Sequence, residues 1–224
     1  MTSRLGSFVR DIFLPSRCLG CGRIVDAEVC LCFLCEDKIH FLHESFSDHN
    51  ELRERCSVLF PVQVACSLMK YERNALAKKM IHSLKYGQRE SIGQYIARMA
   101  IERLDIGALR PDLLVSIPLH LRKYRKRGYN QLHLFTETLS EYYHIPYDHK
   151  VLKRNKHLKS QAQKNKSARQ KSDFSFSLNR EIENTHVLLI DDVFTTGQTL
   201  AQASWAVLSR KNNKVSILVM AMEG

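Results

Sequence analysis

The stretch Val187-Leu-Leu-Ile-Asp-Asp-Val-Phe-Thr-Thr-Gly-Gln-Thr199 decides the fold of this chain. Its first four residues are apolar and predict a buried strand, whereas the residues from about 198 to 210 predict a helix. Two carboxylates, Asp191 and Asp192, and a threonine-rich turn stand between these elements. Because open α/β folds bind ligands at the carboxyl ends of their strands, the stretch predicts a ligand site.

The turn has the chemistry of an anion site. Backbone N–H groups at the start of a helix lack partners and carry the positive end of the helix dipole, so a phosphate monoester fits there. Gly197 allows a close approach to the backbone, and the threonine hydroxyls can donate further hydrogen bonds. The two carboxylates instead accept hydrogen bonds from sugar hydroxyls, so the predicted ligand is a ribose 5-phosphate unit.

Two simpler explanations of this stretch are weaker. An Asp-Asp pair after an apolar strand also occurs in response-regulator receivers, where it binds Mg²⁺ after the first strand, but here only 32 residues follow Asp192. A helix capped by threonine would account for Thr195 or Thr196. It would not account for all the residues of the stretch together.

The rest of the chain alternates between strand and helix patterns, which predicts an α/β fold with a largely parallel sheet covered on both faces. Strands are expected at Val62–Cys66, Leu113–Ile117, 186–190 and 214–220, with shorter pieces at Val151–Leu152 and Phe174–Leu178. Helices are expected at Leu76–Leu84, Ile92–Met99, Leu132–Tyr142 and 198–210. Composition divides the chain into a cysteine-rich region (1–45), a polar connector (46–57) and the α/β domain (58–224).

The cysteines are concentrated near the N-terminus. Cys18-x₂-Cys21 and Cys32-x₂-Cys35 form two pairs with metal-ligand spacing, which predicts a closed four-cysteine site for a structural Zn²⁺ ion. A redox dithiol is the main alternative, although such motifs favour a single Cys-x-x-Cys pair. Cys30 is left over, because it could replace Cys32 only by losing the two-residue spacing.

The net charge of +11 comes from two short segments. Arg122–Arg127 holds five basic residues, and Lys150–Lys171 holds nine with no acid, so the remaining 20 basic residues are balanced by 23 acids. Such clusters indicate sites for phosphate-bearing ligands or nucleic acid; the alternative is a pair of solvated loops. Tyr124 and Tyr129 beside the first cluster could stack on bases or be buried. The apolar runs are too short to span a bilayer, so we expect a cytoplasmic protein without membrane insertion.

The stretch at 187–199 resembles the signature of type I phosphoribosyltransferases. Ile117-Pro-Leu-His120, Arg127-Gly-Tyr-Asn-Gln131, Ile81-His-Ser-Leu-Lys-Tyr-Gly87 and the cysteine-rich N-terminus together resemble the ComF family, over essentially the whole chain. The resemblance implies that phosphoribosyl pyrophosphate (PRPP) binds, with Mg²⁺, to Asp191, Asp192, Val193, Thr195, Thr196, Gly197, Gln198 and Thr199, and to Pro118 and Leu119 of a pyrophosphate loop. The sequence departs from the family pattern at two positions in loops. Gly87 directly follows Tyr86, where an intervening residue is expected, and Ser172 stands where relatives often have asparagine.

The resemblance also implies an activity, phosphoribosyl transfer (a pentosyl glycosyltransferase reaction) to an acceptor that the sequence does not name. The 153–171 segment matches the catalytic loop of these folds, and Arg127, Lys153, Arg154 and Arg169 are the candidate catalytic residues, with Lys156 and Gln161 as further candidates. Resemblance to competence proteins implies a role in DNA uptake, with single-stranded DNA and proteins of the uptake machinery as partners. The alternative is a non-catalytic zinc-ribbon protein that binds single-stranded DNA, in which PRPP binding is regulatory or vestigial.

Overall fold

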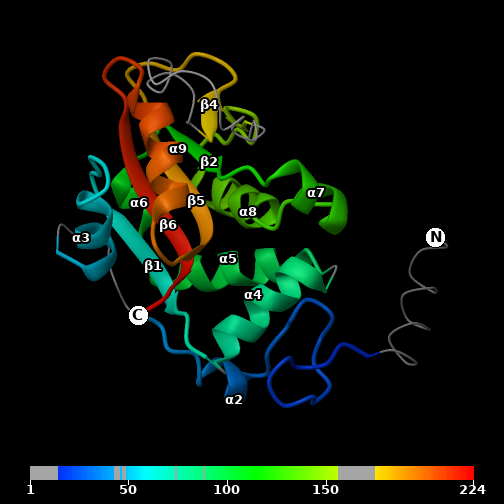
Figure 1. Ribbon diagram of the computed structural model, residues 1–224. Coiled ribbons are helices and arrows are strands. Elements are labelled where there is room, and N and C mark those ends of the chain that lie inside the picture. The colour runs from blue at the N-terminus through cyan, green and yellow to red at the C-terminus, as the bar shows by residue number, and fades with distance from the viewer. Residues whose placement is uncertain (1–14, 43–45, 47–48, 74, 88, 156–174) are drawn as a thin grey trace, which may run out of the picture.

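A four-stranded parallel sheet forms the centre of the molecule (Figure 1). The computed structural model describes residues 15–42, 46, 49–73, 75–87, 89–155 and 175–224. The strands lie in the order β1-β6-β5-β2, and their bounds are β1 Ala65–Lys70, β6 Lys214–Met222, β5 His186–Phe194 and β2 Leu113–Ser116. The predicted α/β fold with a parallel sheet is therefore confirmed.

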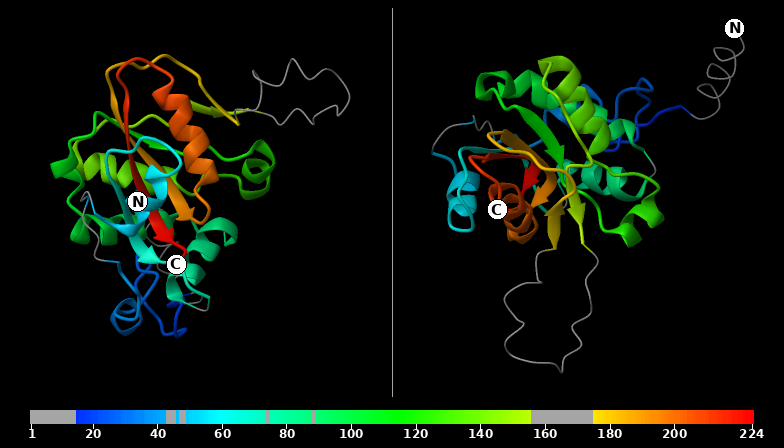
Figure 2. Two further views of the ribbon diagram at one scale, coloured as in Figure 1. Left: turned by 60° about the vertical axis from the view of Figure 1, so that its left-hand side comes forward. Right: turned by 90° about the horizontal axis from the view of Figure 1, so that it is seen from above.

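Helices cover both faces of this sheet (Figure 2). On one face lie α5 (Ser91–Arg103) and α8 (His133–Tyr143), with α4 (Leu76–Tyr86) next to α5; on the other lie α3 (Glu51–Ser57) and α9 (Gln198–Leu208). Residues 187–190 of β5 and 215–222 of β6 are all buried, because neither face of these strands reaches solvent. Continuous apolar runs are typical of parallel strands that are covered on both sides.

Both edges of the sheet are paired by chain segments outside the four strands. Leu42 N donates to Leu68 O at 3.1 Å along β1, and Leu114 N donates to Pro146 O at 2.8 Å along β2. Such pairing shortens the open edges that could template association with another chain.

The remaining elements are short. α2 (Phe33–Glu36), α6 (Ile106–Leu109) and α7 (Leu121–Arg127) each span two turns or fewer, and β3 (Leu152–Arg154) pairs antiparallel with β4 (Phe176–Leu178). Most of the predicted catalytic loop lies between β3 and β4. Its residues Lys156, Gln161 and Arg169, together with Ser172 and Phe174, lie outside the described residues.

Several boundaries differ from the expected ones. β1 begins at Ala65, three residues later than expected, although Val62 is already buried. The segment expected as a connector contains α3, whose Leu52 and Cys56 are fully buried against the domain. α7 was not predicted, because its sequence carries no apolar face. Within the described residues, no helix has the length and apolar character needed to cross a membrane.

Candidate functional site

The acidic pair lies on β5 itself, beside the end of β2. β5 continues through both acids to Phe194, further than the strand expected at 186–190. Ile117 N donates to Ile190 O at 2.9 Å, so Pro118 and Asp191 follow neighbouring residues of adjacent strands. The structure thus brings the predicted pyrophosphate-loop residues Pro118 and Leu119 to the same end of the sheet as the acids, where β2 ends.

Asp192 is held by two side chains that were not predicted as site residues. Lys85 Nζ lies 2.7 Å from Asp192 Oδ1, and Gln131 Nε2 donates to Asp192 Oδ2. Arg127 Nη1 in turn donates to Gln131 Oε1 at 2.7 Å. The predicted catalytic residue Arg127 is therefore linked to the acidic pair through Gln131. Lys85 and Gln131 occur in the quoted motifs at 81–87 and 127–131, which was the available sequence signal for them.

Asp191 has a different environment from its neighbour. Its Oδ1 accepts a hydrogen bond from Asp192 N at 2.8 Å. Burial, followed by the charge of Asp192, raises the pKa of Asp191 to about 7. A carboxylate whose ionised form is costly gains most from new hydrogen-bond donors, such as sugar hydroxyls.

The turn after β5 presents backbone donors at the start of α9. Gly197 is the N-cap residue of α9, with φ of 74°. Because glycine has no side chain, no side-chain oxygen caps this helix start. A Cβ at this position would lie 2.6 Å from Leu59 Cδ1 and 2.8 Å from Phe194 Cε2, so glycine is required by both conformation and space. Asp191, Val193 and the turn residues from Thr195 to Thr199 line one small hollow, which contains all the predicted turn residues.

A larger cavity of 810 Å³ opens beyond Pro118 and Leu119. Lys153 and Arg154 of β3 line it, together with His133 at the start of α8 and His149. Arg154 is near enough to Asp191 to oppose the rise in the pKa of Asp191 that burial and Asp192 cause. The Arg154 Nε atom is buried and has no hydrogen-bond partner in the described part of the chain. The cavity therefore has cationic groups next to the acidic pair.

A cationic surface formed by α7 lies near Lys85. No residue of α7 is buried, and five of its seven residues are basic. Tyr124 is 46% exposed and Tyr86 is 55% exposed, and the Arg127 guanidinium lies 5.0 Å from the centre of the Tyr86 ring. A hydrogen bond from Arg127 lowers the pKa of Tyr86. Tyr129, by contrast, points inward and donates to Leu84 O.

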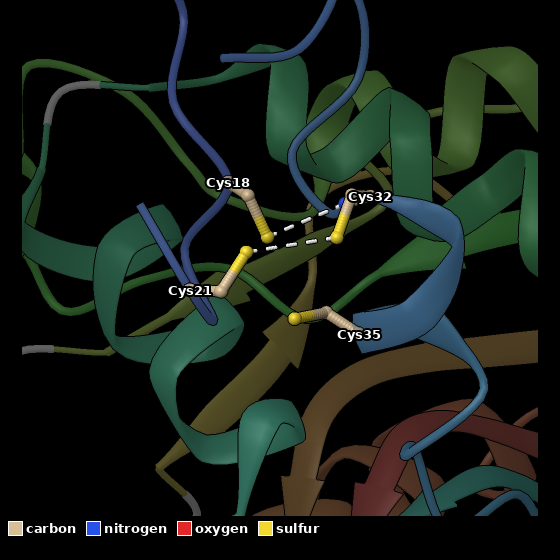
Figure 3. Close-up of side chains that lie close together, drawn as sticks. All are labelled: Cys18, Cys21, Cys32 and Cys35. Carbon is tan, nitrogen blue, oxygen red and sulfur yellow. Dashed lines mark hydrogen bonds between the residues drawn. The ribbon is translucent and has the colours of Figure 1, made fainter. Parts of the chain in front are cut away.

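The four cysteines of the two predicted pairs converge at one point (Figure 3). Their sulfur atoms lie within 4.8 Å of one another, and Cys21 Sγ is 3.7 Å from Cys32 Sγ. Tetrahedral zinc at about 2.3 Å from each sulfur separates the sulfurs by roughly 3.8 Å. The cluster can therefore bind a structural zinc ion. It includes Cys32 and not Cys30, whose pKa is raised to about 12 by burial.

The local backbone favours the thiolate form of Cys18. Cys18 Sγ accepts hydrogen bonds from Gly20 N at 3.4 Å and Cys32 N at 3.3 Å. Burial acts to raise the pKa of Cys18, but backbone N–H groups, including that of Cys32, lower it to about 6. A Cβ on Gly20 would lie 2.6 Å from Cys35 Sγ, so glycine is needed inside the first cysteine pair.

Fold and site together define a class of protein. The parallel sheet flanked by helices, with an N-terminal cluster of four cysteines, is consistent with a type I phosphoribosyltransferase-like fold that carries a zinc ribbon. No family model matches the chain.

Three curated relatives narrow the class. The chain is 28% identical over 149 residues to the DNA utilization protein YhgH of Escherichia coli K12, covering 64% of this chain and 65% of that protein. It is 37% identical over 99 residues to competence protein F of Haemophilus influenzae (42% and 43%), and 30% identical over 142 residues to competence protein ComFC of Bacillus subtilis (62% and 57%). The match spans less than two thirds of each relative's length. With the four-cysteine cluster, these relatives support the ComF family.

Proposed function

We propose that this protein binds PRPP at the carboxyl edge of β5 and β2 and cleaves its bond to pyrophosphate, with a role in DNA uptake or utilization. The observation that carries the proposal is the arrangement of Asp191 and the uncapped turn of α9 around one hollow. The turn supplies donors for a 5-phosphate, and Asp191 supplies an acceptor for the ribose hydroxyls. The names of the relatives support the link to DNA.

In the proposed reaction, the C1–O bond of PRPP breaks and its electron pair leaves with pyrophosphate. A nucleophilic atom of the acceptor supplies the electron pair of the new bond to C1 of the phosphoribosyl group and releases its proton to solvent. Lys153 and Arg154 line the cavity beside the acidic pair and would balance the charge of the pyrophosphate. When bound with PRPP, Mg²⁺ would supply a further positive charge to the leaving group. Lys85 and Gln131 would hold Asp192 in place, and Arg127 would orient Gln131.

Calorimetric titration with PRPP and Mg²⁺ tests the binding step. We expect heat of binding for the wild type and none for the Asp191→Ala/Asp192→Ala double mutant. Asp112→Ala is a matched control, because that carboxylate lies at the opposite end of β5, where it accepts from His186 N. Equal heats for the wild type and the double mutant, or none for either, would refute the assignment.

A second function is favoured by the α7 surface. Five basic residues lie on a helix that buries nothing, and two exposed tyrosines lie beside them. Cations that follow a phosphate backbone, with aromatic rings that stack on bases, are typical of surfaces that bind single-stranded nucleic acid. We infer that α7, Tyr86 and Tyr124 form a contact surface for single-stranded DNA.

Salt-dependent binding to a fluorescent single-stranded oligonucleotide tests this second function. The Arg122→Ala/Arg125→Ala/Lys126→Ala variant should bind at least tenfold more weakly and show a smaller dependence on salt, because about three phosphate contacts are lost. Arg127 is left intact because it also contacts Gln131. A control with the same loss of charge, Lys79→Ala/Lys211→Ala/Lys214→Ala, should bind like the wild type. If both variants bind equally, the DNA contact lies elsewhere.

A further inference from the structure

A second cluster of metal-ligating side chains lies at the wall of the 810 Å³ cavity, apart from the cysteines. It consists of His133 and Glu137 on α8 and His149 after that helix, and their ligand atoms lie within 4.8 Å of one another. His133 and Glu137 are four residues apart, so they share one face of α8. Both histidines line the cavity.

The spacing within this cluster suits a small divalent ion. His149 Nε2 lies 3.1 Å from Glu137 Oε1. Two ligand atoms at about 2.0 Å from a tetrahedral zinc ion lie roughly 3.3 Å apart. The second ring nitrogen, His149 Nδ1, lies 2.8 Å from the hydroxyl of the buried residue Ser116. Because a hydroxyl both donates and accepts, Ser116 can bond to the Nδ1–H tautomer that leaves Nε2 free for a metal.

His133 supplies the adjustable ligand. Its ring stacks on that of His149, with centroids 3.8 Å apart and 14° between the planes. A bound ion lies near the plane of each imidazole, so one of the two rings has to turn. The nitrogens of the His133 ring have no hydrogen-bond partner among the described residues, whereas both nitrogens of His149 are engaged. The outer torsion of histidine is broad, so His133 can turn at little cost.

We propose that His133, Glu137 and His149 form a second metal site, which binds a divalent transition ion of the zinc type. Two imidazoles and one carboxylate are a ligand set for such ions, and three protein ligands leave positions open. The open side faces the cavity that Lys153 and Arg154 also line, so the expected additional ligand is an anionic group such as phosphate or carboxylate. This site does not depend on the proposed PRPP reaction.

Zinc content per chain tests the site in the full-length protein. After dialysis against a small excess of Zn²⁺, elemental analysis should give about two zinc ions per wild-type chain, one for the cysteines and one for this cluster. His133→Ala and Glu137→Gln should each give about one. The matched controls His82→Ala, an exposed histidine on α4, and Glu141→Gln, exposed one turn further along α8, should keep two. One zinc ion in the wild type, or two in both site variants, would overturn the proposal.

A second measurement covers the case in which a variant fails to fold. In the wild type, added Zn²⁺ should shift the ring signals of His133 and His149 in nuclear magnetic resonance spectra, but not that of His82. Ser116→Ala should weaken zinc binding at this cluster at least tenfold, because it removes the partner that positions His149. Ring signals that do not respond to Zn²⁺, or an unchanged affinity in Ser116→Ala, would contradict the assigned ligands and the positioning role, respectively.

Discussion

Asp191 and Asp192 are adjacent in sequence, but their surroundings give them different roles. Asp192 is neutralised by Lys85 and bonded to Gln131, whereas Asp191 has one backbone donor and a pKa raised by burial and by its neighbour. Strand geometry accounts for this difference, because successive side chains of β5 point to opposite faces of the sheet. Asp192 meets the helices of one face, and Asp191 remains next to the turn of α9.

The raised pKa of Asp191 predicts that ionisation of this carboxyl group lowers the free energy of unfolding. Between the usual carboxyl pKa of 3.8 and about 7, the folded state keeps a proton that the unfolded state loses, so the free energy of unfolding falls as pH rises through this window. Asp191→Asn should therefore be more stable than the wild type at pH 8, by about 1–3 kcal/mol, and by much less at pH 5. Urea denaturation at both pH values measures this. An equal gain at both values, or a loss at pH 8, would contradict the assigned environment.

Lys85 should matter for stability because its ion pair with Asp192 is largely shielded; the two side chains are only 20% and 12% exposed. Lys85→Met leaves a shielded carboxylate without its cation and should cost about 1–3 kcal/mol of unfolding free energy. Lys79→Met on the same helix removes an exposed lysine and should cost less than about 0.5 kcal/mol. Similar midpoints for the two variants in urea denaturation would show that the ion pair contributes nothing.

Among the elements, α5 holds the N-terminal ribbon, which comprises the described residues 15–42 with the four cysteines. Tyr95 Oη donates to Glu36 Oε2 at 2.5 Å, and Arg98 lies 3.2 Å from Glu28. Arg103 reaches Glu36 at 3.4 Å and lies 4.0 Å from the centre of the Phe41 ring. The described part of the ribbon carries only short secondary structure, so a zinc ion bound by the four cysteines would supply much of its order.

If the four cysteines bind zinc as proposed, its removal should destabilise more than the ribbon. We expect a strong chelator to lower the melting temperature by about 5 °C or more, because the contacts to α5 are lost with the ribbon. Gly20→Ala should release zinc at lower chelator concentration, whereas Gly22→Ala, where a Cβ meets nothing within 4 Å, serves as the comparison, although its φ of 76° adds local strain. Calorimetric melting with and without chelator measures the effect. An unchanged melting temperature after complete zinc loss would contradict a structural role.

The elements that were predicted correctly have an apolar pattern that burial imposes, on one face of a helix or on both faces of a strand. α4, α5 and α8 carry apolar residues at helical spacing, and β5 and β6 carry continuous apolar runs. α7 could not be predicted this way, because a helix that buries nothing has no apolar stripe. The start of β1 was predicted too early because Val62 is buried, as a strand residue would be. It lies before the residues that pair with β6.

For the whole molecule, sequence patterns identify local ligand sets but not contacts between distant segments. The cysteine pairs and the turn at 195–199 are each continuous in sequence, and the structure keeps each group together. Lys85 and Asp192 are 107 residues apart, so only the folded sheet and helices bring them into contact. His149 likewise meets Glu137 because residues 146–148 pair along the edge of β2. These long-range contacts join α4 to the acidic pair, and α8 to the segment that runs along β2.

In the proposed site, the turn after β5 holds a 5-phosphate while Asp191 holds the ribose. Backbone amide shifts on addition of ribose 5-phosphate test it most directly, with ribose alone and inorganic phosphate as comparisons. We predict that ribose 5-phosphate shifts the amide signals of Asp191 and of Thr195–Thr199 more than either comparison does, and that Asp191→Asn reduces the advantage over inorganic phosphate. Largest shifts elsewhere in the chain, or equal responses to ribose 5-phosphate and phosphate, would contradict this site.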